Sequence, residues 1–166
     1  MKKLNNKGFS LVELIIVIAI MAILVGVVGT QVIPYLENSR KAKDTQIFSA
    51  WNTAAVSAYS TEAGNVDANK TYKIEIKKSS GGITVNAYNA SGTADADNKG
   101  ETAIKKTFCA LTDLDPAVGY DYGSLASKAG KDVTSVLITI NGGNGEVVTT
   151  VSNSSSKYSF DPIENK

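Results

Sequence analysis

The chain has 166 residues, of which 43% are hydrophobic, 17 are Lys or Arg and 16 are Asp or Glu. This length is too short for two large domains, and the balanced charge gives no bulk attraction for nucleic acid or anionic lipid. There is one cysteine, Cys109, and no histidine, which excludes an intramolecular disulfide, a Ser-His-Asp triad and the usual zinc sites. No P-loop or dinucleotide fingerprint occurs. We therefore expect that the protein is not an enzyme and that it has no catalytic residue, cofactor or metal.

The first predicted element is an apolar helix that follows a short basic segment. Residues 1–8 contain three lysines and no acid, and no side chain from Leu14 to Val28 is polar. As a helix that rises about 1.5 Å per residue, the 21 residues from Phe9 to Gly29 cover about 30 Å, the thickness of a bilayer's hydrocarbon core. The positive-inside rule places the N-terminus in the cytoplasm and the rest of the chain outside.

One ionisable side chain, Glu13, interrupts the apolar segment near its beginning. A carboxylate near the core of a membrane helix costs about 2.5–3.5 kcal/mol, so something must compensate for it, or the segment must leave the lipid. A cleaved secretory signal, with Val27 and Gly29 as the small residues of its cleavage site, and a plain signal anchor are two alternatives. Neither explains Glu13. A buried core helix is disfavoured because the run is long and apolar on every side.

A resemblance to a known family rests on the segment Lys7-Gly8-Phe9-Ser10-Leu11-Val12-Glu13-Leu14. This segment looks like the processing site of a type IV prepilin, a precursor with a class III signal. The resemblance covers about residues 1–60. It implies that a prepilin peptidase removes residues 1–8 on the cytoplasmic side and that Phe9, the new N-terminus, is then methylated. Glu13 matches the family's glutamate, five residues into the mature chain, which takes part in filament assembly.

The function implied by this resemblance is that of a structural subunit, most like a major pilin of a type that lacks the C-terminal disulfide. Such a protein enters the cytoplasmic membrane and then polymerises through its N-terminal helix into a surface filament for adhesion, motility or biofilm. The implied partners are identical subunits, the prepilin peptidase, membrane lipid before assembly, and an assembly machinery with an ATPase and a membrane platform protein. A pseudopilin of a secretion or competence system is one alternative. A membrane-anchored monomeric binding domain is the other, and such an anchor would gain nothing from Glu13.

A weak point in the helix is predicted where the apolar segment gives way to polar sequence. Gly26, Gly29 and Pro34 cluster there, and Pro34 cannot donate the helical hydrogen bond. A simple helix end is an alternative, but we expect a bend in one continuous helix because helical periodicity resumes beyond Pro34. The expected segments are a leader, an apolar transmembrane or filament-core helix, its amphipathic continuation, and a globular β-rich head: 1–8, 9–34, 35–64 and 65–166.

The amphipathic continuation is predicted from apolar residues that recur at helical spacing. Gly64 and Asn65 provide its C-terminal stop. We expect Asp44 on its polar face. The dry face is expected to carry Leu36, Lys43, Ile47, Ala50, Trp51, Ala54 and Ala58.

The remainder of the chain predicts a mostly antiparallel sheet with one more helix. Two hairpins and a final edge strand are expected, and Pro162 is tolerated in such a strand. The expected strands are 72–77, 83–88, 133–140, 146–151 and 158–163. A helix over 101–114 is predicted from Ile104, Phe108 and Leu111. The fold class is α+β, a type IV pilin fold in which a long N-terminal helix, its apolar half protruding, packs by its amphipathic half on the sheet.

Two acidic stretches of the head were weighed as calcium loops. The stretch that begins at Asp95 has Lys99 and Lys106 at positions where an EF-hand loop needs Asp or Asn and Glu. The second contains Asp113, Asp115 and Asp121 near Gly119 and Gly123. We predict polar loops at both places, and we expect Cys109 to be a small core residue rather than a reactive thiol.

Overall fold

The computed structural model describes residues 8–79, 82–90, 99–114 and 124–165. Its internal contacts divide the chain into two compact units, residues 1–39 and 40–166, and each is described by itself. The first unit is helical. It contains α1 (Leu11–Val27), the π-helical turn η1 (Val28–Val32) and the beginning of α2 (Ile33–Thr61). The chain therefore stays helical from one side of Pro34 to the other.

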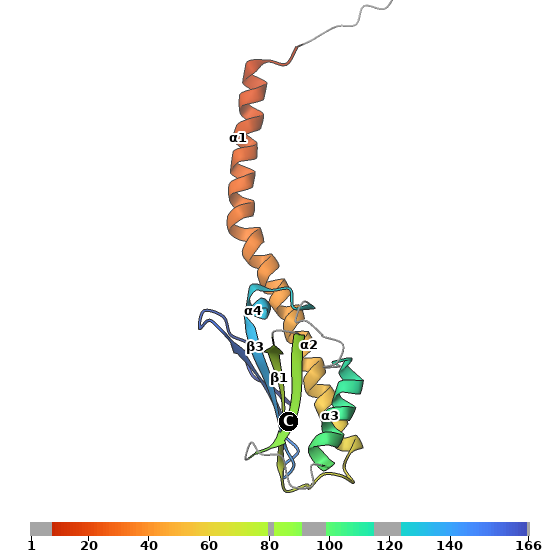
Figure 1. Cartoon of the computed structure of the whole chain (residues 1–166). Coiled ribbons are helices and arrows are strands. Elements are labelled where there is room, and N and C mark those ends of the chain that lie inside the picture. The colour runs from red at the N-terminus through yellow and green to blue at the C-terminus, as the bar shows by residue number, and fades with distance from the viewer. Residues whose placement is uncertain (1–7, 80–81, 91–98, 115–123, 166) are drawn as a thin grey trace, which may run out of the picture. The chain divides into compact units, whose positions relative to one another are not determined.

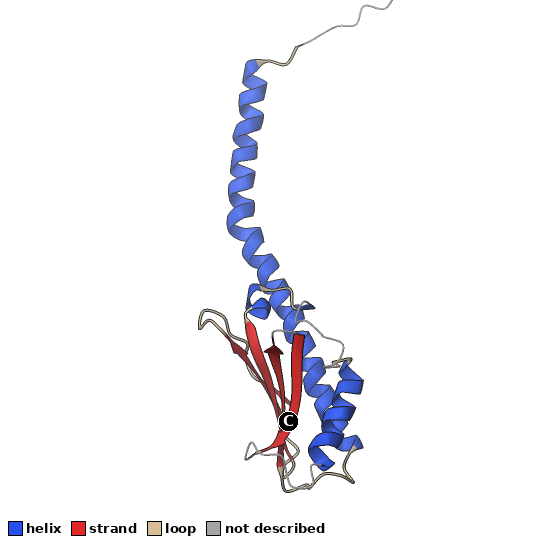
Figure 2. Cartoon of the chain, viewed as in Figure 1, coloured by secondary structure: helices blue, strands red, loops and turns tan. Residues whose placement is uncertain are grey.

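The second unit combines the greater part of α2 with a five-stranded antiparallel sheet, whose strand order is β2-β1-β3-β4-β5. The strands are β1 (Thr71–Ser79), β2 (Gly82–Asn89), β3 (Val133–Asn141), β4 (Val147–Asn153) and β5 (Ile163–Asn165). Two further helices are α3 (Lys99–Thr112) and the short α4 (Lys128–Lys131). In Figure 1, α2 and α3 lie side by side, and Figure 2 shows the strands gathered in one layer beside them. The predicted α+β, pilin-like fold is confirmed.

The core of this unit forms where one face of the sheet meets α2 and α3. Alternation along β1 turns Tyr72, Ile74 and Ile76 inward, and all three are buried, as predicted for this strand. Phe48 of α2 and Phe108 of α3 are fully buried against them in the same cluster. Each large apolar side chain removed from water in this way contributes about 1.5–3 kcal/mol. The packing of one face of the sheet against α2 and α3 therefore stabilises a unit whose single cysteine cannot form an intramolecular disulfide.

The buried stripe of α2 differs from the predicted one. Lys43 and Ala50, which were expected on the dry face, are exposed, whereas Asp44 is fully buried. The buried residues are Asp44, Phe48, Trp51, Asn52, Ala55 and Ala58. They recur at an i, i+4, i+7, i+8 spacing that begins at Asp44, whereas the predicted stripe begins that spacing at Lys43. Because successive residues of a helix differ by about 100° in direction, a shift of one position turns a different face of α2 toward the core. Trp51 and Ala58 are buried as predicted, but the prediction was wrong at Lys43 and Ala50, and at Asp44, which it assigned to the surface by its charge.

Two further predictions about the head were wrong in part. Leu111 of α3 is 54% exposed, although Ile104 and Phe108 on the same helix are buried. The last strand begins at Ile163, so the segment from 158 to 162 is not a strand. Phe160 explains this shift, because its ring packs edge-on against Phe48, with ring centroids 5.0 Å apart, and holds the segment against α2. The strand begins directly after Pro162, which has no N–H to donate to the ladder.

One carboxylate holds the C-terminal end of α2 against α3. Glu62 Oε1 accepts the hydroxyl of Thr107 at 2.6 Å, and its Oε2 accepts the side-chain amide of Asn65 at 2.8 Å. These two hydrogen bonds, the one from Thr107 first, hold the pKa of Glu62 below its ordinary value. The ionised form is therefore the one that the contact with α3 favours.

Asn52 joins α2 to the two strands at one edge of the sheet. Its buried side-chain amide donates to the Val147 carbonyl at 3.3 Å, to Thr149 Oγ1 at 3.0 Å and to the Ile163 carbonyl at 3.2 Å. Thr149 is itself fully buried, so this amide satisfies a hydroxyl that would otherwise lack a partner. The contact holds β4 and β5 on the helix.

We expect the substitution Asn52→Ala to lower the free energy of unfolding by about 1–3 kcal/mol, because it leaves buried acceptors without their donor. Urea unfolding of the purified full-length chain, followed by Trp51 fluorescence, measures the change. The control is Thr53→Ala at the next residue, which is exposed. This substitution should change the free energy of unfolding by less than about 0.5 kcal/mol. Equal effects of the two substitutions would contradict the role given to Asn52.

Asp44 holds a second part of the unit, the segment that leads into α4. Its Oδ1 accepts the backbone N–H of Ala126 at 2.9 Å, and its Oδ2 accepts the N–H of Ser127 at 3.0 Å together with the Ser127 hydroxyl. Gly130 packs so closely that a β-carbon there would overlap the carboxylate. A buried charge is tolerated here because three donors converge on it.

The substitution Asp44→Asn should destabilise the folded chain by about 1.5–3 kcal/mol. The NH₂ group of asparagine would face the N–H groups of Ala126 and Ser127, which cannot accept a hydrogen bond from it, and the Ser127 hydroxyl, which donates here. The same unfolding experiment measures the change in stability. The matched control is Asp161→Asn on an exposed residue, which should be close to neutral. Stability of Asp44→Asn equal to that of the control would show that the carboxylate is not a structural anchor.

Candidate functional site

The predicted cleavage junction lies ahead of the first helix, in non-helical chain. Gly8 and Phe9 are exposed, and the Phe9 side chain is 87% accessible. A β-carbon added at Gly8 would meet no atom within 4 Å. The fold therefore gives no reason for a glycine here, and a requirement for one would have to come from an enzyme that binds the junction. Residues 1–7 of the leader lie outside the described residues.

Glu13 takes part in the N-terminal cap of α1. Its Oε2 accepts the backbone N–H of Ser10 at 2.9 Å, and Ser10 Oγ accepts the N–H of Val12 at 3.4 Å, which together make a capping box. Such contacts satisfy N–H groups that have no partner within the helix. This role of Glu13 was not predicted, although the Ser-x-x-Glu pattern that signals it is present in the sequence. Glu13 is thus brought next to the residue that follows Phe9.

The helix α1 presents an apolar surface that the protein itself does not cover. None of its 17 residues is buried. By length and composition, the helix that begins at Leu11 is the one among the described residues that could cross a membrane. Apolar surface of this size in water is unfavourable, so α1 needs lipid or other protein around it. Membrane insertion as a precursor follows from this surface.

The residues predicted as a weak point border the π-helical turn η1. Thr30, within the turn, donates its hydroxyl to the carbonyls of Gly26 at 3.2 Å and Val27 at 3.3 Å. Pro34 follows within one turn and lacks the N–H that would bond to the carbonyl four residues back. A π-turn is a common way to accommodate such a defect without ending the helix. Gly29 lies within η1, and whether the helix yields here remains a prediction.

Glu101 and Cys109 are two further candidate groups in the second unit. Glu101 is buried in the first turn of α3, where the helix dipole favours a carboxylate, but its Oε1 has no hydrogen-bond partner among the described residues. Cys109 is partly buried and packs against the core. Among the described residues, no three His, Cys, Asp or Glu side chains lie close enough to hold a metal. Of the two acidic stretches of the head, residues 95–98 of the first and 115–123 of the second lie outside the described residues.

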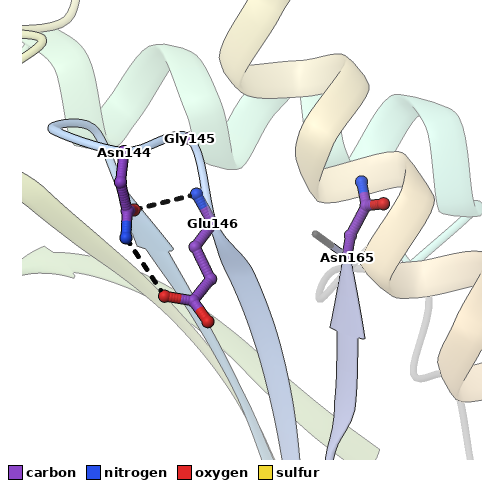
Figure 3. Close-up of a pocket in the computed structure, with 4 residues that line it drawn as sticks. All are labelled: Asn144, Gly145, Glu146 and Asn165. Atoms are coloured by element: carbon purple, nitrogen blue, oxygen red, sulfur yellow. Dashed lines mark hydrogen bonds between the residues drawn. The ribbon is translucent and has the colours of Figure 1, made fainter.

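One hollow of about 340 Å³ lies between the β3–β4 turn and the last strand (Figure 3). It is lined by Asn144, Gly145, Glu146 and Asn165. The Asn144 side-chain amide donates to Glu146 Oε2 at 3.2 Å, and its Oδ1 accepts the Glu146 N–H at 3.0 Å. These groups thus satisfy one another and hold the turn. We interpret the hollow as part of the turn rather than as a binding site.

The comparison with protein families gives one match, to the prokaryotic N-terminal methylation motif, over residues 3–29. No curated protein and no solved structure matches the chain. The matched range contains Gly8, Phe9 and Glu13, and it ends within η1. The matched motif implies processing by a prepilin peptidase and assembly into type IV pili. The match over residues 3–29, together with a long helix that continues onto an antiparallel sheet, supports a class III signal prepilin of the type IV pilin or pseudopilin kind.

Proposed function

We propose that this protein is the major structural subunit of a type IV pilus. The observation that carries the proposal is the exposed apolar surface of α1, which has no buried residue in the single chain. In a filament core, the same surface is covered by the helices of identical subunits, and it stays dry during the transfer from lipid. A head of about a hundred residues, 65–166, suits a major pilin better than a pseudopilin, whose head tends to be smaller.

The proposed life of the chain begins in the cytoplasmic membrane, with the N-terminus inside and the head outside. A prepilin peptidase removes the leader after Gly8, and Phe9 becomes the methylated N-terminus. The assembly machinery, with its ATPase and platform protein, then moves the subunit from the membrane into a surface filament. Residues 9–34 form the filament core and residues 35–64 connect it to the head. The weak point at Gly26, Gly29 and Pro34 lets the helix bend between the two.

In this proposal Glu13 sets the register between subunits. After cleavage, the α-amine of Phe9 carries a positive charge near neutral pH, and an unpaired ion in the filament core costs several kcal/mol. Pairing of Glu13 with the Phe9 amine of a neighbour neutralises both charges at one axial offset only. A pairing within one subunit is the alternative. The capping contact uses Oε2, so Oε1 is the oxygen that we assign to the amine.

The proposal as a whole is tested by mass spectrometry of the mature protein and by electron microscopy of the cells that produce it. A chain that begins at methylated Phe9, together with surface filaments composed of it, is the expected result. A processed protein that stays in the membrane as a monomer would instead support the membrane-anchored binding domain.

We expect Gly8→Leu to leave the full-length precursor in the membrane. The fold has open space at this position, so the substitution should not disturb the protein itself, and any effect reports on the peptidase. Immunoblotting and mass spectrometry of membranes measure the ratio of precursor to mature chain. The control is Gly64→Leu, at another glycine with open space, which should be processed normally. Removal of residues 1–8 from the Gly8→Leu protein would show that the cleavage site is wrong.

The substitution Glu13→Gln separates the two roles of this residue, because glutamine also serves in a capping box but carries no charge. We expect it to permit processing and to abolish or greatly reduce filaments, as Glu13→Ala should. Sheared filaments and membranes of cells that also express the wild type provide the measurement, and the variant should be depleted in the filaments.

The control for this experiment is Ser10→Ala, which weakens the cap and keeps the charge, so filaments should form. Equal incorporation of Glu13→Gln and wild type would contradict the register proposal. If only Glu13→Ala and Ser10→Ala failed to assemble, the cap rather than the charge would be the reason for Glu13.

A further inference from the structure

The strand β2 forms one edge of the sheet in the second unit. It pairs with β1 over eight consecutive residue pairs, from Ser79 with Gly82 to Tyr72 with Asn89, without a shift in register. On its other side it has no strand partner among the residues that the structure describes. Among the described residues, the part of β2 from Ile83 to Tyr88 therefore presents backbone N–H and C=O groups along a regular edge. Such an edge is a template for another strand.

The two edges of the sheet differ in how they are protected. The opposite edge ends in β5, which has only three residues, follows Pro162 and carries Glu164. Short length, proline and charge are the usual devices that prevent pairing with another chain. None of them occurs in β2, whose sequence is Gly-Ile-Thr-Val-Asn-Ala-Tyr-Asn. Among the described residues, α3 also contacts β2, but no strand pairs with its outer edge, so this edge can accept another strand.

We propose that β2 pairs antiparallel with β2 of a second copy of this chain, about a two-fold axis at Asn86. The side chains of Val85 and Ala87 point to the core face of the sheet, and those of Thr84, Asn86 and Tyr88 to the other face. A two-fold axis at Asn86 places Val85 opposite Ala87 of the partner copy and Thr84 opposite its Tyr88. Each residue then faces one from the same side of the sheet, so both cores stay on one side.

The chemistry of this strand favours its own copy as the partner. At the axis two asparagine amides face each other, and amides can both donate and accept. Like charges opposite each other destabilise a strand pair, and β2 has no charged residue. The side chains of Thr84 and Asn86 are exposed, so the approach needs no rearrangement of the core. A self-complementary patch of this kind is the basis of an isologous contact.

An isologous contact closes after two copies and cannot extend a filament. Successive subunits of a polar filament are related by a heterologous contact that repeats without limit. If the chain assembles as proposed above, β2 pairing therefore joins two neighbouring filaments side by side. This consequence rests on the proposed function, but the pairing itself is a property of the sheet and does not depend on it.

Cysteine cross-linking of the full-length chain tests the pairing and its register. Cys109 is first replaced by alanine, and Asn86→Cys or Thr84→Cys is then introduced. In the proposed register, the Cα atoms of the two residues 86 lie about 4.5–5.5 Å apart, which suits a disulfide. The two residues 84 lie about 13 Å apart, which does not.

After mild oxidation, Asn86→Cys should give at least about tenfold more covalent dimer than Thr84→Cys on a non-reducing gel, because only the first pair meets the geometry of a disulfide. The experiment is done on detergent-solubilised membranes as well as on sheared filaments. A dimer in the membranes of cells without filaments would support the pairing and contradict only the proposed function. Equal dimer from both variants, or none from either, would overturn the pairing.

A charge on the edge provides the second measurement. Asn86→Lys places two lysines opposite each other and should abolish the lateral association of filaments in electron micrographs while single filaments persist. Ser135→Lys adds the same charge to the same face of the sheet on the central strand β3 and should leave bundles unchanged. Bundles that survive Asn86→Lys, or that are lost equally with both variants, would overturn the proposed role of β2.

Discussion

The apolar surface of α1 is the constraint on which the rest of the molecule depends. Seventeen residues form a helix with none of them buried, so this part of the chain is stable only in lipid or among other helices. Without water, every backbone N–H at the helix N-terminus must find its partner in the protein. The capping box of Ser10 and Glu13 supplies such partners at the N-terminal end of α1. A single carboxylate in an apolar helix thus has a local reason, independent of any neighbour.

The second unit is a small domain that is held together without an intramolecular disulfide. Two buried polar residues of α2 do this by reaching segments far along the sequence. Asp44 contacts Ser127, 83 positions away, and Asn52 contacts Ile163, 111 positions away. Each contact closes a long loop of chain onto the helix, and each is buried where water cannot compete for the hydrogen bond. The late elements of the chain are therefore held by polar contacts in addition to their packing.

These same residues mark the limit of what the sequence predicted. The strands could be found because alternation such as that of Tyr72, Ile74 and Ile76 depends only on a period of two. The stripe of α2 could not, because Asp44 and Asn52 are ordinary surface residues until their partners are known. The last strand was misplaced because the packing of Phe160 on Phe48 decides where it begins. At the candidate site, the Gly8–Phe9 junction and Glu13 were visible in a local motif, and the capping box could have been read from the same residues.

In the proposed filament, the transfer of α1 from lipid to a helical core would explain why assembly depends on a few polar atoms. Lipid chains and neighbouring apolar helices cover the surface of α1 about equally well, so the hydrophobic effect scarcely distinguishes the two states. It also scarcely distinguishes one axial offset from another, because the side chains from Leu14 to Val28 are all apolar. A charge that must be neutralised does distinguish offsets, since an unpaired ion in that environment costs several kcal/mol. In the proposed filament, apolar contact therefore provides the cohesion, and Glu13 with the Phe9 amine provides the geometry.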